Sequence, residues 1–99
     1  MGVYIGRGFD FFTSEGGILT YRLRLEDIEP DFNAVNISIK DMADRRVHYW
    51  IEKNNTIYIK QGTAHQLRVV FRDVQLDRLD RHMANFDFYS DGNYRWKLV

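Results

Sequence analysis

The side chains best suited to metal chemistry in this chain are three evenly spaced histidines, His48, His65 and His82. Three imidazoles can hold a zinc ion and leave one coordination position open for catalysis. In strands, metal ligands normally alternate closely or meet from neighbouring strands, and only His48 lies in a clear strand pattern. His65 is expected in a turn and His82 in a charge-rich segment. The sequence therefore predicts three independent surface histidines, with no bound metal and no cofactor.

Carboxylates suited to acid–base catalysis gather in residues 73–82, DVQLDRLDRH. Such groups catalyse proton transfer only where burial shifts their pKa values, and alternating charge is more typical of a solvated surface. The serines lie in no nucleophile-elbow sequence, and the Gly-Arg-Gly at residues 6–8 lacks the residues that follow a phosphate-binding loop. No catalytic constellation is present, so the sequence predicts a protein that is not an enzyme.

The composition is that of one ordinary globular domain spanning residues 1–99. Apolar residues make up 44%, charged residues 28%, and the formal net charge is zero. Neutral net charge argues against a protein whose main task is to bind a phosphate backbone. The chain has no cysteine, which excludes disulfides and thiolate catalysis. With neither a signal-peptide pattern nor a long apolar stretch, the sequence predicts a soluble protein, cytoplasmic by default, that does not bind a membrane.

Residues 46–62, RVHYWIEKNNTIYIKQG, contain two alternating segments around an asparagine pair, which predicts a β-hairpin. A two-residue loop would mix apolar and polar residues on both faces. A three-residue loop separates them, and asparagine suits it because asparagine tolerates the left-handed conformation. The face expected in the core consists of Val47, Tyr49, Ile51, Ile57 and Ile59. The face expected to be exposed consists of His48, Trp50, Glu52, Tyr58 and Lys60. The alternative is a register shifted by one residue, which would place Trp50 in the core.

The N-terminal third of the chain predicts a second hairpin. Residues 3–13 form an apolar strand in which glycines 6 and 8 indicate a bend or a close backbone approach. Residues 18–28 alternate plainly, with Leu19, Tyr21, Leu23 and Leu25 on one face. The favoured register sets Phe11 opposite Tyr21 and Phe9 opposite Leu23 in the core. It also sets Asp10 opposite Arg22 on the outer face, where an ion pair helps to define the register.

Four later segments complete the predicted elements. Residues 34–40 alternate with Val35, Ile37 and Ile39 inward, and residues 66–72 alternate with Leu67, Val69 and Phe71 inward. Residues 74–83 break this period, and their leucines and methionine predict a short helix or an irregular segment. Residues 86–98 predict a third hairpin with a three-residue loop at 91–93, placing Phe88 opposite Trp96, Phe86 opposite Leu98 and Asp87 opposite Lys97.

These elements together predict an all-β fold, an antiparallel β-sandwich of about seven strands, with a small open β-barrel as the alternative. The outward side chains predict a binding surface, because Trp, Tyr and Arg often dominate binding energy at protein interfaces. The candidate binding residues are His48, Trp50, Glu52, Tyr58, Lys60, Arg68 and Arg72.

Function is expected to be that of a non-catalytic protein-interaction module, such as an inhibitor, adaptor or assembly subunit. It would bind a protein partner, including a second copy of itself as a homo-oligomer, through this sheet face or an edge strand. The alternative is carbohydrate binding, with Trp50 and Tyr58 stacked on sugars. A third hypothesis is binding of single-stranded nucleic acid, using Arg22, Arg24, Arg68 and Arg72.

Overall fold

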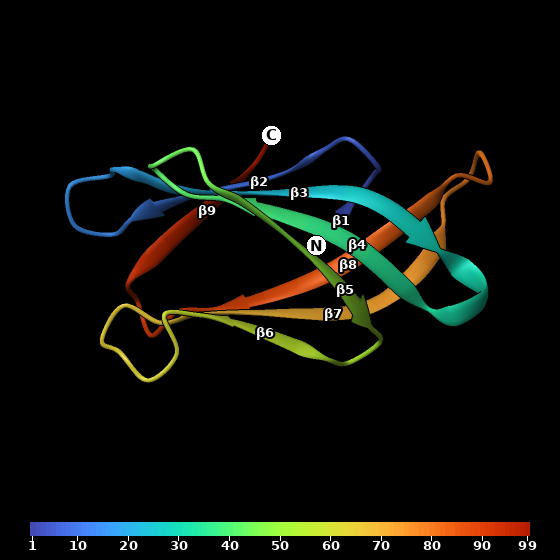
Figure 1. Ribbon diagram of the computed structural model, residues 1–99. Coiled ribbons are helices and arrows are strands. Elements are labelled where there is room, and N and C mark those ends of the chain that lie inside the picture. Colours follow the sequence, from blue (N-terminus) through green and yellow to red (C-terminus); the bar gives the residue numbers. More distant parts are fainter.

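The computed structural model describes residues 1–99 and shows two antiparallel sheets packed face to face (Figure 1). This confirms the predicted β-sandwich, and the barrel alternative is wrong because no strand pairing joins the two sheets. The four-stranded sheet has the order β1 (Gly2–Val3), β8 (His82–Tyr89), β7 (Leu67–Leu76) and β6 (Thr56–Ile59). The five-stranded sheet has the order β5 (Arg46–Glu52), β4 (Ala34–Lys40), β3 (Leu19–Glu29), β2 (Gly8–Thr13) and β9 (Tyr94–Leu98). A single 3-10 turn, η1 (Pro30–Phe32), joins β3 to β4.

Apolar residues at alternate positions of both sheets form one core between the layers. The predicted inward residues of β4 and β7 are all buried, as are Tyr21, Leu23 and Leu25 of β3. A bulge after Leu25 shifts the alternation of β3 by one residue, so Ile28 also faces the core. The core is rich in aromatic rings, which Phe88 links across the two layers.

The hairpin of β2 and β3 has the predicted register. Phe9 pairs with Leu23, Phe11 with Tyr21, and Asp10 with Arg22. The Arg22 Nε lies 2.9 Å from the Asp10 Oδ1. Asp10 faces outward as predicted but is buried, because the strands on both sides and the Arg22 side chain cover it.

The predicted N-terminal strand is divided between the two sheets. Residues 2–3 pair with β8, the chain turns at Gly6, and β2 then pairs with β3. Gly6 has a positive φ of 87°, which suits glycine. A Cβ at Gly8 would lie 1.8 Å from the Leu23 carbonyl oxygen, so the predicted bend and close approach are both present.

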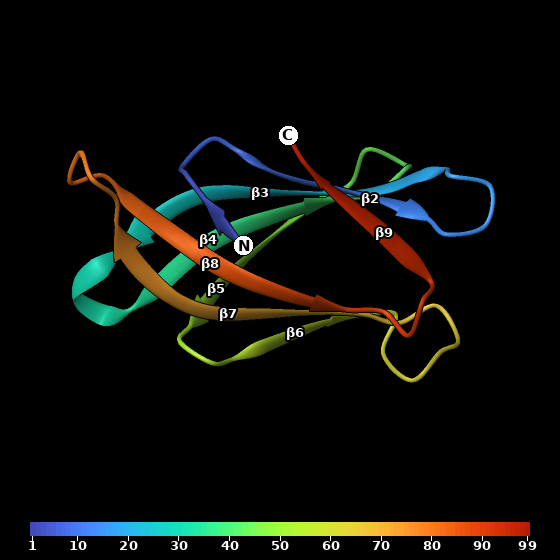
Figure 2. The ribbon, with the colours of Figure 1, turned by 180° about the vertical axis from the view of Figure 1, so that it is seen from behind.

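The hairpin predicted for residues 46–62 is wrong. β5 pairs with β4 over its full length, and β6 pairs with β7 in the other sheet. The asparagine segment therefore carries the chain from one layer to the other, as the views from the front and from behind both show (Figures 1 and 2). Asn54 does have a positive φ of 67°, as a tight reversal requires. Ile51 of β5 is in the core, and Tyr49, Ile57 and Ile59 pack against the core from their separate sheets.

The hairpin predicted for residues 86–98 is wrong for the same reason. β8 pairs with β7 and β1, whereas β9 pairs with β2. Phe88 and Trp96 do contact each other, with ring centroids 5.5 Å apart, but they come from opposite sheets. Asp87 forms an ion pair with Arg72 at 2.6 Å and does not face Lys97.

The short helix predicted near residues 74–83 is absent. β7 continues to Leu76, β8 begins at His82, and only a tight turn separates them. Within this turn the Asp77 Oδ1 accepts the backbone N–H groups of Leu79 and Arg81, at 2.8 and 2.9 Å. The Arg81 Nε donates to the Asp77 Oδ2 at 2.8 Å, so this ion pair closes a tight turn.

The same turn occurs between β4 and β5, and both have the sequence Asp-x-x-Asp-Arg. The Asp41 Oδ1 accepts the N–H groups of Ala43 and Arg45, at 2.9 and 3.0 Å, and the Arg45 Nε donates to the Asp41 Oδ2. The second aspartate, Asp44 or Asp80, has a positive φ of 62° or 56°. An aspartate that accepts local N–H groups can replace the backbone pairing of a regular hairpin loop.

We predict that the turn at Asp77 makes the free energy of unfolding depend on pH in the acid range. The Arg81 and Leu79 N–H groups, the Tyr4 hydroxyl and the Arg81 guanidinium lower the pKa of Asp77 well below its usual range. A lowered folded-state pKa contributes stability that is complete above the unfolded pKa of about 4 and is lost as the pH falls below it. Asp77→Asn should therefore be less stable than the wild type near neutral pH, with the difference shrinking toward about pH 2.

Urea unfolding followed by circular dichroism across this pH range tests the prediction. Asp31→Asn, in the exposed 3-10 turn, is the matched control and should differ little from the wild type at any pH. A constant difference between Asp77→Asn and the wild type over the whole range would contradict the proposed role of the ionised carboxylate.

Candidate functional site

The seven residues predicted to form one binding surface lie in two groups on opposite outer faces of the sandwich. His48, Trp50 and Glu52 lie on β5, at the edge of the five-stranded sheet. The other four residues belong to the four-stranded sheet or its loops and are Tyr58, Lys60, Arg68 and Arg72. Trp50 is 60% exposed and Tyr58 is 41% exposed, so each is accessible as predicted. Their shared surface is not present, because it depended on a hairpin that does not form.

Side chains of the group on the four-stranded sheet interact with other residues of the same sheet. Tyr58 pairs with Arg68, which pairs with Tyr89, and the Arg68 guanidinium lies 4.3 Å from the centroid of the Tyr89 ring. Arg72 donates to the Asp87 Oδ2 at 2.6 Å and to the Tyr89 hydroxyl at 3.0 Å. The bond to Asp87 is the largest cause of the raised Arg72 pKa. Val70, which lies between Arg68 and Arg72 in β7 and opposite Asp87, is buried on this face.

Asp87 and Tyr89, the two partners of Arg72, were not among the predicted site residues, but the strand period of residues 86–89 indicates where they lie. Asp87 and Tyr89 alternate with two buried phenylalanines, which places both on the outer face. The hairpin predicted for residues 86–98 placed Asp87 opposite Lys97, but Lys97 pairs with Asp10 in the other sheet. Lys60 lies just beyond β6 with a positive φ of 53° and is exposed.

The group on β5 has no such partners. His48, Trp50 and Glu52 are exposed, and no side-chain hydrogen bond or ion pair holds them. Their neighbour Arg46 differs, since its Nη1 donates to the Ser38 Oγ at 2.6 Å. The exposed β5 side chains are therefore available for contact with another molecule.

The backbone of β5 is also open along one side. At the ends of the β4–β5 ladder, the Lys53 N–H donates to the Asn33 carbonyl and the Asp41 N–H donates to the Arg45 carbonyl, both at 3.0 Å. In an antiparallel ladder, residue pairs that exchange backbone hydrogen bonds alternate with pairs that do not. Because Arg45 and Lys53 at the two ends bond to the β4 side, the odd-numbered residues of β5 are those that bond to β4. The even-numbered residues, which carry the outward side chains, direct their N–H and C=O groups to the free edge, except that the Glu52 C=O accepts from the Asn55 N–H at 3.0 Å.

A small, mainly apolar hollow lies beside this edge, between β5 and β6. Its volume is about 250 Å³, and three charged residues, Asp41, Arg45 and Lys60, line it together with six apolar ones. The apolar residues are Tyr21, Ile39, Val47, Tyr49, Tyr58 and Ile59. Val47, predicted to be core, is 49% exposed because β5 is an edge strand without a neighbour on that side. An inward side chain of an added strand would lie over this hollow.

The geometry bears on the two alternative binding modes. Trp50 and Tyr58 point from opposite outer faces, so one sugar cannot stack on both rings. The four arginines considered for nucleic acid divide in the same way, with Arg22 and Arg24 on the five-stranded sheet and Arg68 and Arg72 on the other.

The three histidines lie on different elements, on β5, in the loop after β6 and at the start of β8. No three histidine or carboxylate side chains lie close enough together to share a metal ion. No helix in the structure has the length and apolar character needed to cross a membrane.

The protein is a small antiparallel β-sandwich in which β5 is a long edge strand with one open side. Comparisons with protein-family models, curated proteins and solved structures found no match. A β-sandwich hosts many unrelated functions, so the fold alone does not identify one. The functional argument therefore rests on the open edge of β5.

Proposed function

We propose that this domain is a non-catalytic protein-interaction module, an assembly subunit that pairs its β5 edge with the β5 edge of a second copy. The observation that carries the proposal is the free side of β5, which combines unpaired backbone groups with an exposed tryptophan. Long exposed edge strands readily pair with another chain unless charge, proline or a bulge blocks them. β5 contains neither a proline nor a bulge.

The backbone supports an antiparallel self-pairing centred on Tyr49. In that register Tyr49 faces Tyr49 of the second copy, and every even-numbered residue of β5 faces another even-numbered residue. The even-numbered residues are those whose N–H and C=O groups point to the free edge. The facing groups of His48 and Trp50 can then form hydrogen-bonded pairs, as an antiparallel ladder requires, whereas the Glu52 carbonyl already accepts from the Asn55 N–H at 3.0 Å.

The outward side chains are complementary in the same register. Glu52, which has no partner in its own chain, lies opposite Arg46 of the second copy, and His48 lies opposite Trp50. Opposite charges and aromatic pairs across neighbouring strands each add about 0.2–1 kcal/mol. Shifting the register by two residues would remove both Arg46–Glu52 pairs, so the side chains favour the centred pairing.

The inward side chains add apolar contact. Val47 lies opposite Ile51 of the second copy, and the apolar hollow between β5 and β6 lies next to the new strand pair. A contact of one strand pair is small, so we expect a dissociation constant in about the micromolar to millimolar range. Trp50 is expected to supply a large share of the binding energy, as exposed tryptophans at interfaces often do.

His48→Pro tests the edge directly. Proline removes the His48 N–H, which points to the free edge, without removing a bond to β4, and edge strands tolerate proline at such positions. The wild type should show a concentration-dependent dimer in sedimentation velocity, and His48→Pro should remain monomeric with an unchanged circular dichroism spectrum. His48→Ala is the matched control, since it loses the same side chain but keeps the N–H and should still dimerise.

Trp50→Ala should weaken the dimer at least about tenfold. Leu79→Ala, at a still more exposed apolar residue in the β7–β8 turn, should leave the dimer unchanged. A wild-type protein that stays monomeric at about 1 mM, or a His48→Pro variant that dimerises normally, would contradict the proposed dimer.

A further inference from the structure

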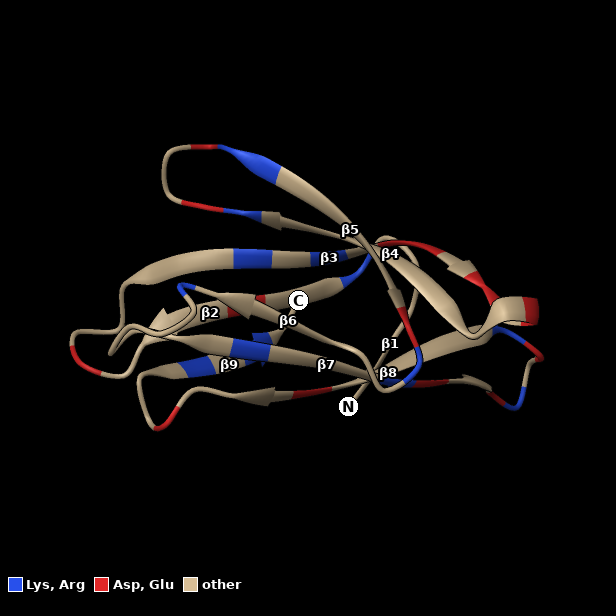
Figure 3. Cartoon of the chain, turned by 60° about the horizontal axis from the view of Figure 1, so that its bottom comes forward, with Lys and Arg blue, Asp and Glu red and all other residues tan.

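The outer face of the five-stranded sheet is basic although the whole chain is neutral. One register row crosses all five strands and contains Lys97, Asp10, Arg22, Lys40 and Arg46, in that order. Four of these five residues are cations. In Figure 3 the Lys and Arg segments are visible along β3 and at the start of β5. The sequence alone gives no sign of this concentration, because the residues come from different segments of the chain.

A hollow of about 350 Å³ opens beside this row. Of its ten lining residues, five are cations and one is an acid. The cations are Arg7, Arg22, Arg24, Lys40 and Arg46, and the acid is Asp10. Gly8 and the fully buried Ser38 are the register neighbours of Arg24 on either side. Because neither residue projects a large side chain, space is left around Arg24.

Three of the arginines are held in place by acceptors of the fold. The two oxygens of Asp10 accept from Arg22 Nε at 2.9 Å and from Arg22 Nη2 at 3.4 Å. The Ser38 hydroxyl accepts from Arg46 and donates to the Glu26 Oε1, each at 2.6 Å. The Arg7 Nε donates to the Val99 carbonyl oxygen at 2.9 Å. Each guanidinium has five N–H donors, so each keeps donors that the fold does not use.

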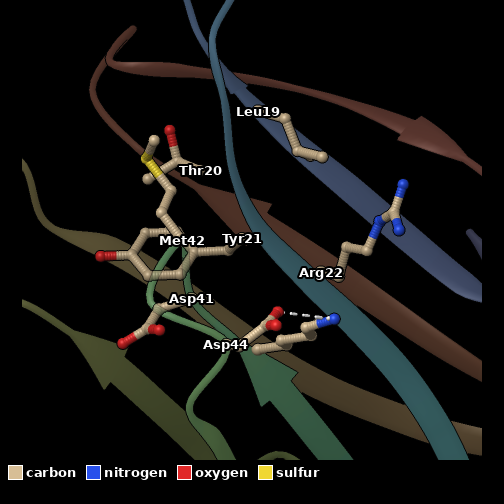
Figure 4. A pocket seen from close by; sticks show the side chains of 8 residues that line it. Leu19, Thr20, Tyr21, Arg22, Asp41, Met42 and Asp44 are labelled. Carbon is tan, nitrogen blue, oxygen red and sulfur yellow. Dashed lines mark ion pairs between the residues drawn. The ribbon is translucent and has the colours of Figure 1, made fainter.

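Arg24 is the least engaged of the five cations. Its only polar contact is an Nε–Oε1 separation of 3.8 Å from Glu26, and it makes no hydrogen bond. Lys40 is more engaged, since its Nζ lies 2.9 Å from the Asp44 Oδ1, the ion pair drawn in the neighbouring hollow of Figure 4. The five cationic side chains face three side-chain carboxylates, those of Asp10, Asp44 and Glu26, and Glu26 also lies 3.5 Å from the Arg46 Nη1. Among side chains, two positive charges therefore remain in excess.

We propose that this hollow binds a phosphate group. Guanidinium groups present planar donor pairs that match phosphate oxygens, and several of them here approach one space from different strands. An excess of two positive charges suits an anion with a similar negative charge. The phosphate comes from a free phosphorylated small molecule or from the phosphodiester backbone of single-stranded nucleic acid, which share this chemistry. The site lies on the outer face, and Arg46 is the one cation of the site that also belongs to the β5 edge.

Two titrations at low salt test the proposal and separate the sources. Inorganic pyrophosphate is titrated by isothermal calorimetry, and a fluorescein-labelled oligothymidylate by fluorescence anisotropy. Binding of both, with an oligothymidylate affinity that falls steeply with salt, indicates the phosphodiester source. Binding of pyrophosphate alone indicates a small phosphorylated molecule. Absence of binding in both titrations overturns the proposal.

Arg24→Ala is the decisive variant. It should lower the affinity for the bound probe at least about tenfold, the loss expected for charge-assisted hydrogen bonds. Arg78→Ala removes the same charge from the β7–β8 turn, outside the hollow, and should change the affinity by less than about twofold. Equal losses in the two variants would mean that net charge alone attracts the probe, which would overturn the assigned site. Both arginines are exposed, and circular dichroism checks that each variant is folded.

Discussion

Replacing Phe88 with alanine is expected to lower the free energy of unfolding by about 3–5 kcal/mol. The Phe88 ring on β8 packs edge-to-face against Phe9 and Phe11 of β2, with centroids 4.9 Å apart in both pairs. It also contacts Trp96 of β9 at 5.5 Å. Phe88 therefore links the four-stranded sheet to two strands of the other sheet, and its loss would leave a cavity that both layers line.

Urea unfolding followed by circular dichroism measures this loss. Phe32→Ala is the matched control, since Phe32 lies in the 3-10 turn and is 76% exposed. That variant should change the free energy of unfolding by less than about 0.5 kcal/mol. A loss below about 1.5 kcal/mol for Phe88→Ala would contradict the role given to this ring. Domains of this kind have about 5–15 kcal/mol of stability, so the expected loss is a large part of the total.

Gly8→Ala is expected to lose more than about 4 kcal/mol or to prevent folding. The added Cβ would lie 1.8 Å from the Leu23 carbonyl oxygen and 2.8 Å from its carbonyl carbon. Both atoms belong to the backbone of β3, so no side-chain rotation can relieve the overlap. β2 and β3 would have to separate where they carry Phe9 and Leu23 into the core.

Gly6→Ala separates this steric effect from the effect of backbone conformation. A Cβ at Gly6 would meet nothing within 4 Å, but its φ of 87° is unfavourable for alanine. The expected cost is about 1–2 kcal/mol. Thermal unfolding of the two variants under the same conditions provides the comparison. If Gly8→Ala were no less stable than Gly6→Ala, the close approach of β2 and β3 would not limit the choice of residue.

The three predicted hairpins show what the alternation of apolar and polar residues can and cannot predict about strand pairing. The β2–β3 hairpin was predicted correctly, including the Asp10–Arg22 pair, because two clear alternating strands follow each other with complementary charges. The other two predictions failed although the strands were correctly located. Alternation tells which side chains face the core, but both sheets face the same core. A short loop can therefore return the chain to the same sheet or carry it to the opposite one.

The Asp-x-x-Asp-Arg turns are a case in which the signal was present but misread. The pattern occurs at residues 41–45 and again at residues 77–81. Leu76 and Leu79 near the second occurrence of the pattern suggested a helix. The repetition of Asp-x-x-Asp-Arg would instead have indicated a turn. Local hydrogen bonds to Asp41 and Asp77 decide the structure of both segments.

The sequence by itself determined the sandwich class and which side of most strands faces the core, because these follow from the two-residue period of a strand. It did not determine burial at every position, since Val47 is exposed at the sheet edge and the outward-facing Asp10 is buried. Tertiary structure decided which sheet each strand joins. That choice separated Trp50 from Tyr58, left β5 with an open edge, and gathered Arg7, Arg24 and Arg46 around one hollow. The physical reason is that strand pairing depends on the packing of the two layers, which involves residues far apart in the chain, whereas the period of burial is a local property of each strand.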